Sequence, residues 1–326
     1  MARRSRRAGS NAPAQGDPLT VADSNFIRAC RRQPVSRTPV WFMRQAGRYM
    51  REYRALRERH SLLELCRTPD LATEVTLQPV RRLDIDAAIL FSDLLLPLEP
   101  MGIRFDFIKG EGPAIENPIQ SEADIDALRT FEPRDALGHV LTAIRQIQKE
   151  LGGRLPLIGF GGAPFTLASY AIEGGHSNNF AKTKSLMYGH PAAWHRLCEH
   201  FATATANYLV AQIEAGVNAV QVFDSWVGAL NAGDYREFVL PHTQRIFAAL
   251  AASGVPTIHF GVGTGSILAE LREAGGDVIG VDWRTPLDEA WDRIGPDRAV
   301  QGNLDPTLLL GPIDRMVNAA DEVIER

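Results

Sequence analysis

Long apolar runs and clustered cysteines are missing from this sequence of 326 residues. No stretch of about 18 or more apolar residues occurs, and no apolar segment follows the arginines at the N-terminus, so neither a membrane span nor a secretory signal is expected. The three cysteines, Cys30, Cys66 and Cys198, are too few and too scattered for a disulfide framework, and none forms a CxxC pair. We therefore expect a cytoplasmic protein with reduced thiols and no membrane partner.

Positive charge is scarce outside the N-terminus. The net charge is −4, but four arginines fall in the first sixteen residues without an acid among them, and the rest of the chain has 31 basic against 39 acidic residues. Nucleic-acid binding needs a basic surface or stripe, so no nucleic-acid partner is expected. The composition of residues 1–20 predicts a disordered basic tail, and residues 21–326 are interpreted as a single domain.

Short apolar runs alternate with segments of helical periodicity, which is typical of repeated strand–helix units. Because the runs are continuous rather than alternating, they favour strands buried on both faces of a parallel sheet. The seven predicted strands are 39–43, 87–91, 155–160, 219–223, 256–260, 278–281 and 299–302. The predicted helices are 71–83, 136–151, 192–215, 241–252 and 266–274.

The predicted fold class is α/β, a (β/α)8 TIM barrel, whose usual size of about 250 residues fits the body of the chain. A doubly wound open sheet is the alternative. Polar residues and glycines follow every run, and a barrel gathers such groups from many strand ends, whereas an open sheet concentrates them near one switch point. Closure takes eight strands and only seven are counted. We therefore expect a barrel that lacks its eighth strand, an incomplete form that is aggregation-prone with little activity.

The densest charge cluster follows the first predicted strand. Six arginines fall within sixteen residues, and only Glu52 and Glu58 oppose their charge. The arginines are Arg44, Arg48, Arg51, Arg54, Arg57 and Arg59. From Arg51 onward, a solvated helix face accounts for the pattern. Arg44 and Arg48 instead flank Ala46 and Gly47, small residues that let the backbone approach a ligand closely. Because guanidinium groups pair bidentately with carboxylates, this loop suits a substrate that carries several of them.

Two further segments could carry chemistry. In LFSDLLLPLEP (90–100), Asp93 ends an apolar strand and meets more apolar residues, so its carboxylate must be paired or functional; a helix cap or an arginine partner is the alternative. In IGFGGAPFTLASYAIEGG (158–175), Pro164 suits the first turn of a helix that would carry Tyr170. Tyr170 is either a core residue or a ligand contact. The glycines do not form GxGxxG, so a nucleotide loop is not favoured.

These segments resemble the uroporphyrinogen decarboxylase family. PVWFMRQAGR (39–48) is similar to one family signature and GFGGAPFTLASYAIEG (159–174) to the other. LFSD, VFDSWVG (222–228), HFGVG and VQGNLDP fall where the family has related strand ends. The resemblance runs from about Val21 to the C-terminus.

The resemblance implies a barrel that works as a homodimer, without metal or organic cofactor, and converts uroporphyrinogen III to coproporphyrinogen III by removing four acetate carboxylates in haem biosynthesis. It assigns substrate binding to the loop of Arg44, Gln45, Ala46, Gly47 and Arg48, with Tyr170 and Ser225 as further contacts and Arg57 near the site. Asp93 would stabilise the pyrrole NH groups and the charge of the intermediate, and Arg44 is the candidate to assist proton delivery. Family members continue with a strand bearing a histidine, which no residue here matches.

Two other functions remain open. A corrinoid or thiol methyltransferase of the same superfamily would bind zinc through clustered His and Cys, but His195 and Cys198 stand without a second cysteine nearby. A tetrapyrrole-binding protein without catalysis would keep every substrate-binding feature. The intact Asp93 and both arginines of the loop favour the enzyme.

Overall fold

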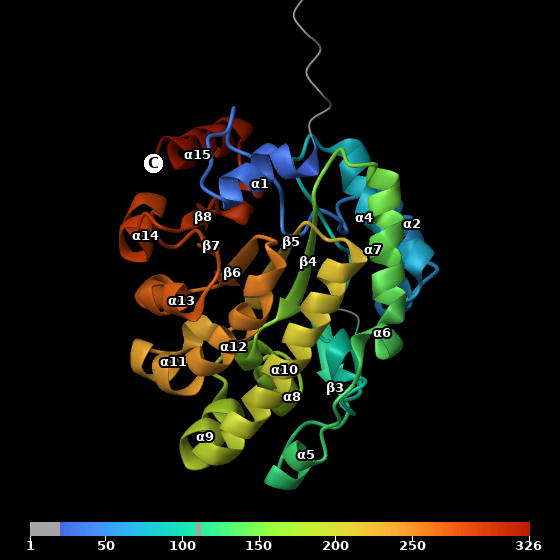
Figure 1. Cartoon of the computed structure of the whole chain (residues 1–326), viewed down its shortest axis with the longest axis vertical. Coiled ribbons are helices and arrows are strands. Elements are labelled where there is room, and N and C mark those ends of the chain that lie inside the picture. Colours follow the sequence, from blue (N-terminus) through green and yellow to red (C-terminus); the bar gives the residue numbers. More distant parts are fainter. Residues whose placement is uncertain (1–19, 109–111) are drawn as a thin grey trace, which may run out of the picture.

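Six parallel strands form the main sheet of the computed structural model, which describes residues 20–108 and 112–326 (Figure 1). Nearly all of the predicted tail, residues 1–19, lies outside the described residues. The strand order is β1-β4-β5-β6-β7-β8, and a separate antiparallel pair joins β2 to β3. The strands are β1 (Ala88–Ile89), β2 (Phe105–Ile108), β3 (Gly112–Ile115), β4 (Leu157–Gly162), β5 (Ala219–Asp224), β6 (Thr257–Gly261), β7 (Val278–Gly280) and β8 (Ala299–Gln301).

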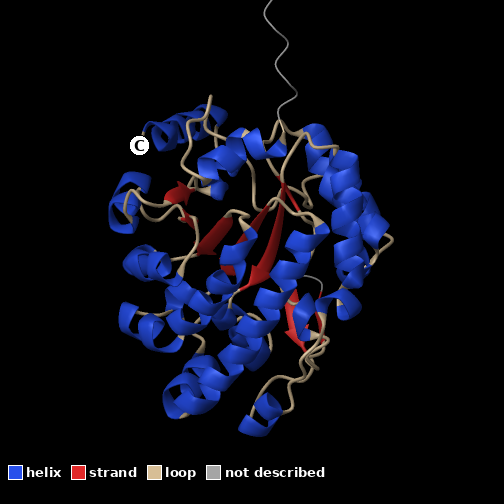
Figure 2. Cartoon of the chain, viewed as in Figure 1, coloured by secondary structure: helices blue, strands red, loops and turns tan. Residues whose placement is uncertain are grey.

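Helices surround the main sheet in Figure 2. The α-helices are α1 (Asn25–Cys30), α2 (Arg51–Arg57), α3 (Leu62–Arg67), α4 (Pro69–Arg82), α5 (Glu122–Asp126), α6 (Pro133–Ala136), α7 (Gly138–Leu151), α8 (Pro164–Glu173), α9 (Ala181–Gly189), α10 (Pro191–Ala215), α11 (Ala232–Phe238), α12 (Leu240–Leu250), α13 (Leu268–Ala274), α14 (Leu287–Ile294) and α15 (Ile313–Glu325). Short 3-10 helices lie at 21–23, 96–98, 227–229, 251–253, 265–267 and 306–310. All five predicted helices are confirmed, with shifts of a few residues at their ends.

The strand order confirms the α/β class and decides between the two predicted architectures. Every main-sheet strand pairs in parallel with the next one along the chain, so the order never reverses. A doubly wound sheet needs such a reversal at its switch point, whereas a (β/α)8 barrel adds its strands in sequence. Within the described residues the sheet is not closed, and β1 and β8 are its outer strands.

The sheet curves as a barrel wall does. The amide of Gln301 on β8 donates to Gln221 on β5 over 3.0 Å, although β6 and β7 lie between these strands in the sheet. This hydrogen bond must cross the inside of a curved sheet. The indole of Trp41 donates to the same Gln301 side chain over 3.1 Å, which brings the segment before Arg44 to the inside as well.

The predicted strand at 39–43 is wrong, because this segment forms no ladder. Pro39 has no N–H, and the N–H of Val40 donates to the Asp86 carboxylate instead of a strand carbonyl. One backbone bond remains, from the Asp86 N–H to the Val40 carbonyl, and the chain turns at Met43. Arg37 holds the same carboxylate through both terminal nitrogens. The segment therefore lies beside the start of β1 as an anchored extended stretch.

The hairpin of β2 and β3 was not predicted. Its strands are short, with only four residues each, and most of their side chains are partly exposed. The alternation in Arg104–Ile108 could have indicated β2, since Phe105 is buried while Asp106 is exposed.

Helix α10 packs on β4 through two glycines of the strand. A Cβ atom on Gly159 would lie 2.4 Å from Oε1 of Gln212, and one on Gly161 would lie 3.1 Å from Thr205. The Gln212 amide accepts from the Phe160 N–H over 3.0 Å and donates to the Phe160 carbonyl over 2.8 Å, all in the buried interior. The missing side chain at 159 thus makes room for the group that satisfies the strand backbone.

We predict that Gly159→Ala destabilises the protein by about 1–3 kcal/mol or more, because the new methyl group displaces Gln212 and leaves buried backbone groups unpaired. Gly138→Ala is the matched control, since a Cβ there meets nothing within 4 Å. Denaturant unfolding compares the two variants with the parent chain. Equal stability of Gly159→Ala and Gly138→Ala would contradict this account of the α10–β4 contact.

Candidate functional site

The predicted site residues gather at the carboxyl ends of the parallel strands. Asp93 follows β1, Ser225 follows β5, and Tyr170 lies on α8, directly after β4. Pro164 occupies the first turn of α8, as predicted, and starts the helix one residue after Ala163, whose N–H bonds to the Phe223 carbonyl of β5. Because parallel strands all end at the same face, these side chains share one mouth of the curved sheet.

Asp93 is held in a partly buried position. Its Oδ1 accepts a hydrogen bond from the Leu95 N–H over 2.9 Å, which is a local turn rather than a helix cap. Burial raises the pKa of the Asp93 carboxyl to about 6, and the Leu95 N–H and the nearby positive charge of Arg44 offset part of that effect. A carboxylate that titrates close to neutral pH at a strand end is typical of a functional group.

Tyr170 lies beside Asp93 and Arg44. The pKa of its phenol is raised by burial and by the negative charge of Asp93, while the charge of Arg44 lowers it. The phenol ring packs edge-on against the indole of Trp226, with ring centroids 5.8 Å apart. The three predicted residues Arg44, Asp93 and Tyr170 are thus brought together from three separate parts of the chain.

The loop at 44–48 is exposed at both arginines and anchored between them. Gln45 is buried, and its Oε1 accepts from the Phe42 N–H over 3.2 Å. Its backbone carbonyl accepts from the hydroxyl of Tyr49. Ala46 packs on a small cluster that contains Met50 and Tyr53. In this structure the Gln45 side chain supports the loop, so the guanidinium groups of Arg44 and Arg48 are the parts free to meet a ligand.

The arginines after the loop serve mainly local structure. Arg54 donates to the Arg48 carbonyl over 2.8 Å, and Arg57 donates to the His60 carbonyl over 2.6 Å beyond the end of α2. Arg51 and Arg59 are exposed, as a solvated helix face requires. The interpretation of this part of the cluster as a helix face is therefore confirmed for most of its length.

Sequence reasoning missed the aromatic lining of the mouth. The rings of Phe160, Phe223 and Phe260 form a ladder, with centroids 5.6 and 5.9 Å apart on β4, β5 and β6. Phe223 lies two residues beyond Gln221 and so shares its inward face. Phe223 and Phe260 are half-buried, which leaves apolar surface at the mouth. The signal was present in the sequence, since each of these strands carries a phenylalanine one or two residues before its end.

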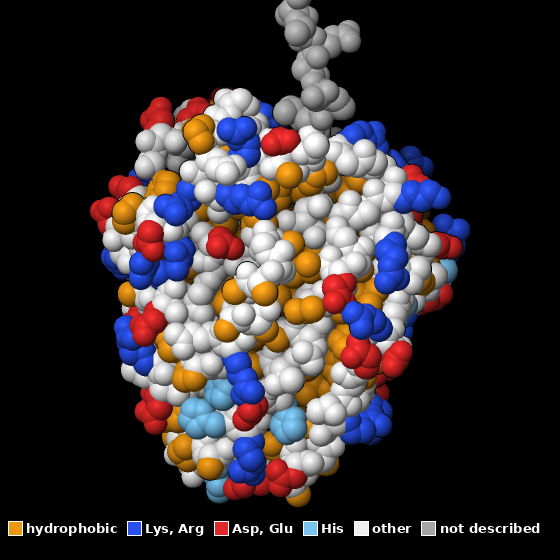
Figure 3. Space-filling model, viewed as in Figure 1, with side chains coloured by type: hydrophobic (Ala, Val, Ile, Leu, Met, Phe, Trp, Pro, Cys, Tyr) orange, Lys and Arg blue, Asp and Glu red, His pale blue; other side chains and the backbone are white. Residues whose placement is uncertain are grey.

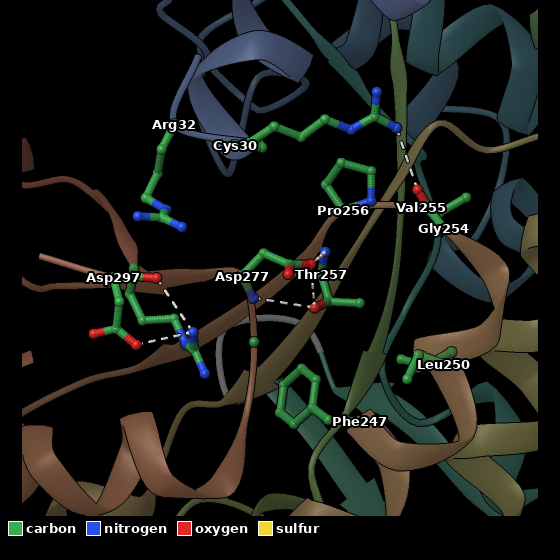
Figure 4. A pocket seen from close by; sticks show the side chains of 14 residues that line it. Cys30, Arg32, Phe247, Leu250, Gly254, Val255, Pro256, Thr257, Asp277 and Asp297 are labelled. Atoms are coloured by element: carbon green, nitrogen blue, oxygen red, sulfur yellow. Dashed lines mark hydrogen bonds and ion pairs between the residues drawn. The ribbon is translucent and has the colours of Figure 1, made fainter.

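Two pockets of the described residues lie away from this mouth. A pocket of about 490 Å³ opens at the amino ends of β6 and β7 and is lined by residues such as Arg32, Thr257 and Asp277 (Figure 4). A second, of about 360 Å³, lies against α10 beside Arg129 and His200. Neither contains a predicted site residue. In a barrel, the amino ends of strands serve stability, so the mouth remains the candidate site.

The distribution of charged side chains and of possible metal ligands bears on the alternative functions that the sequence left open. Positive and negative side chains are interspersed over the face in Figure 3. His195 bonds to His242 over 2.9 Å, whereas Cys198 is fully buried and close to Asp224, so the two point into different surroundings. Among residues 20–108 and 112–326, no group of three or more His, Cys, Asp or Glu could hold a metal ion. In the same residues, no helix is both long and apolar enough to span a membrane.

Comparison with known proteins agrees with this geometry. The sequence model described as "Uroporphyrinogen decarboxylase (URO-D)" matches residues 22–326. A uroporphyrinogen decarboxylase of Sorangium cellulosum is 61% identical over 287 residues, which cover 88% of this chain and 82% of that protein. One of Salinispora tropica is 56% identical over 305 residues, covering 94% and 81%.

A solved structure supports the fold independently. A methyltransferase from Methanosarcina mazei superposes with a TM-score of 0.78 at 20% identity, over 94% of this chain and 90% of that one. This likeness concerns the fold alone. The match of the family model across the domain, together with relatives above 50% identity, shows that this chain belongs to the uroporphyrinogen decarboxylase family.

Proposed function

We propose that this chain is a carboxy-lyase that converts uroporphyrinogen III to coproporphyrinogen III by stepwise removal of four acetate carboxylates. The relatives that match over most of its length carry the name uroporphyrinogen decarboxylase. The observation that carries the proposal is the grouping of Arg44, Asp93 and Tyr170 at the mouth of the curved sheet. In this group, Arg44 is a cation that can pair with substrate carboxylates, and Asp93 is an anion that can stabilise a cationic ring.

The substrate itself supplies the electron sink. A proton added to a pyrrole α-carbon makes the ring cationic, so the bond to the acetate carboxylate can break and its electron pair can move into the ring. Carbon dioxide leaves, the exocyclic methylene carbon takes a proton to become a methyl group, and the ring proton is lost. Ionised Asp93 faces the pyrrole NH groups and stabilises the cation, which is most effective where water is partly excluded.

The remaining residues orient the substrate. Arg44 and Arg48 pair with carboxylates that are not reacting, Ser225 and Tyr170 supply further polar contacts, and the phenylalanine ladder offers an apolar surface to the macrocycle. We also propose that Arg44 assists proton delivery, because its positive charge lies near Asp93. We further propose that the chain acts as a homodimer in the cytoplasm and needs neither metal nor organic cofactor.

Anaerobic incubation with uroporphyrinogen, followed by separation of products by carboxylate number, tests the proposal. We expect products with seven, six, five and four carboxylates, formed with low activity because the sheet of the described residues is not closed. A chain that binds the tetrapyrrole but yields none of them would instead be a non-catalytic binding protein.

We predict that Asp93→Asn lowers kcat by about 10²- to 10³-fold, because the amide keeps the shape and loses the stabilising charge. In the parent chain, kcat/KM should fall as the pH drops through about 6, since protonation neutralises Asp93 there. Rate measurements between pH 5 and 8 check both points. Parent-like turnover in Asp93→Asn would remove this residue from the mechanism.

The same substitution should stabilise the fold. Burial raises the pKa of Asp93 from 3.8 to about 6, so the contribution of this group to stability is fully present below about pH 4 and is lost as the pH rises through 6. The Asn side chain does not ionise, so Asp93→Asn should not lose stability over this pH range. Its free energy of unfolding should exceed that of the parent chain by a difference that grows between pH 4 and 6 to the order of 1–3 kcal/mol. Thermal and denaturant unfolding at several pH values measure the difference, and a constant difference would contradict the burial of the charge.

Arg48→Lys should weaken substrate binding about tenfold, because an ammonium keeps the charge but cannot reproduce the planar fork of a guanidinium. Arg51→Lys is the matched control, being an exposed arginine on α2 three residues further on. KM and product affinity are compared for both variants. Identical effects in the two would show that Arg48 belongs to the solvated helix face.

A further inference from the structure

A buried hydrogen-bonded chain joins α8 to the turn after β5. The hydroxyl of Thr166, on α8, donates to Oδ1 of Asp224 over 3.1 Å and accepts from the Trp226 N–H over 3.4 Å. Thr166 and Asp224 are both fully buried. A single hydroxyl therefore links the last residue of β5 to the backbone two residues beyond, and Ser225 lies between these two attachment points.

The same helix holds this turn a second time. Tyr170 lies four residues after Thr166, one helical turn along the same face of α8. Its ring packs against the indole of Trp226, which also contacts the rings of His176 and Phe180. Thr166 thus fixes the Trp226 backbone while Tyr170 contacts its side chain, so the positions of Tyr170 and Ser225 depend on one another.

The turn after β6 confines the turn after β5 from another side. A Cβ atom on Gly228 would lie 2.2 Å from the Val262 carbonyl oxygen, and one on Gly261 would lie 3.2 Å from the Asp224 carbonyl oxygen. The two turns are packed backbone against backbone. Freedom of the segment 224–226 is therefore limited by β6 on one side and by Thr166 on the other.

Burial of the Asp224 carboxylate costs free energy, and a contribution to stability alone does not explain it. Its Oδ2 atom has no hydrogen-bond partner among the described residues, and the nearby imidazole of His259 has its Nε2 4.0 Å away, beyond hydrogen-bond distance. Both side chains are fully buried. Buried carboxylates with incomplete partners cost free energy, and an apolar replacement is often at least as stable. The Asp224 carboxylate accepts the hydrogen bond of the Thr166 hydroxyl and thereby fixes the direction of that hydroxyl.

We propose that Thr166 and Asp224 are positioning residues that fix the positions of Tyr170 and Ser225 relative to each other, so that both can contact the tetrapyrrole. This inference rests on the proposed decarboxylase function. Both side chains are fully buried between the sheet and its helices, so neither is exposed to a ligand at the mouth. Their hydrogen bonds set where the two substrate contacts stand, and a small displacement of such contacts costs binding and alignment at each of the four decarboxylations.

The test compares Thr166→Val with Thr166→Ser. Valine keeps the size and removes the hydroxyl, so kcat/KM should fall about ten- to a hundredfold, mainly through KM, with partly decarboxylated intermediates accumulating. Serine keeps the hydroxyl and should restore parent-like KM and products. The pH of half-maximal kcat should stay unchanged in both, since Asp93 is untouched. Should valine prevent folding, Thr166→Ala takes its place with the same expectation.

Thr73→Val is the matched control, because Thr73 is also buried and its hydroxyl donates to Gln146 between α4 and α7, away from the mouth. It should lose stability without a change in KM. Asp224→Asn keeps an oxygen that accepts from Thr166, so its KM should stay near that of the parent chain. A large loss of kcat at unchanged KM in Asp224→Asn would show that the charge acts on the reaction, and the positioning role would be overturned.

A binding measurement separates this inference from the function on which it rests. The affinity for coproporphyrinogen, the unreactive product, is measured anaerobically for each variant. Weaker binding in Thr166→Val with rescue in Thr166→Ser supports the positioning role. If the parent chain turns over substrate and Thr166→Val equals it in KM and in product affinity, the inference is wrong while the function stands. If the parent chain forms no product, the proposed function fails first.

Discussion

Burial of the Asp93 carboxylate beside Arg44 is the interaction on which the proposed chemistry of this protein depends. Charge at the end of β1 is costly because the surroundings are apolar, and the cost appears as a pKa of about 6. Arg44 and the Leu95 N–H offset part of the cost, so the group is ionised at neutral pH yet keeps little hydration. Because this anion is poorly hydrated, its attraction to a cationic ring placed against it is strong.

In the proposed mechanism, the rest of the fold holds that anion and its partners in place. The curved parallel sheet brings strand ends that are far apart in the sequence to one mouth. Hydrogen bonds across its inside, from Trp41 to Gln301 and on to Gln221, tie the segment that precedes Arg44 to the opposite strands. The mouth is polar on the side of the loop and apolar at the phenylalanine ladder, which matches a ligand with an apolar centre and a charged rim.

Much of this arrangement could be predicted from the sequence, because strand and helix patterns here are strong. Continuous apolar runs gave six of the strands, and arginines beside small residues marked the loop at 44–48. The segment 39–43 was misassigned, since its apolar pattern does not reveal that Asp86 takes the Val40 N–H. Gln45 is buried and its Oε1 accepts from the Phe42 N–H three residues earlier, a local turn that the sequence pattern did not reveal. The link between Thr166 and Asp224 joins residues 58 positions apart, and no local pattern encodes it.

A carbon-13 NMR titration of the Asp93 carboxyl, assigned by its loss in Asp93→Asn, tests the central claim most directly. We expect a midpoint near pH 6 in the free protein, because burial of the carboxyl raises its pKa. A midpoint near the ordinary value of 3.8 would show that the group is solvated, and would contradict the electrostatic role proposed for it.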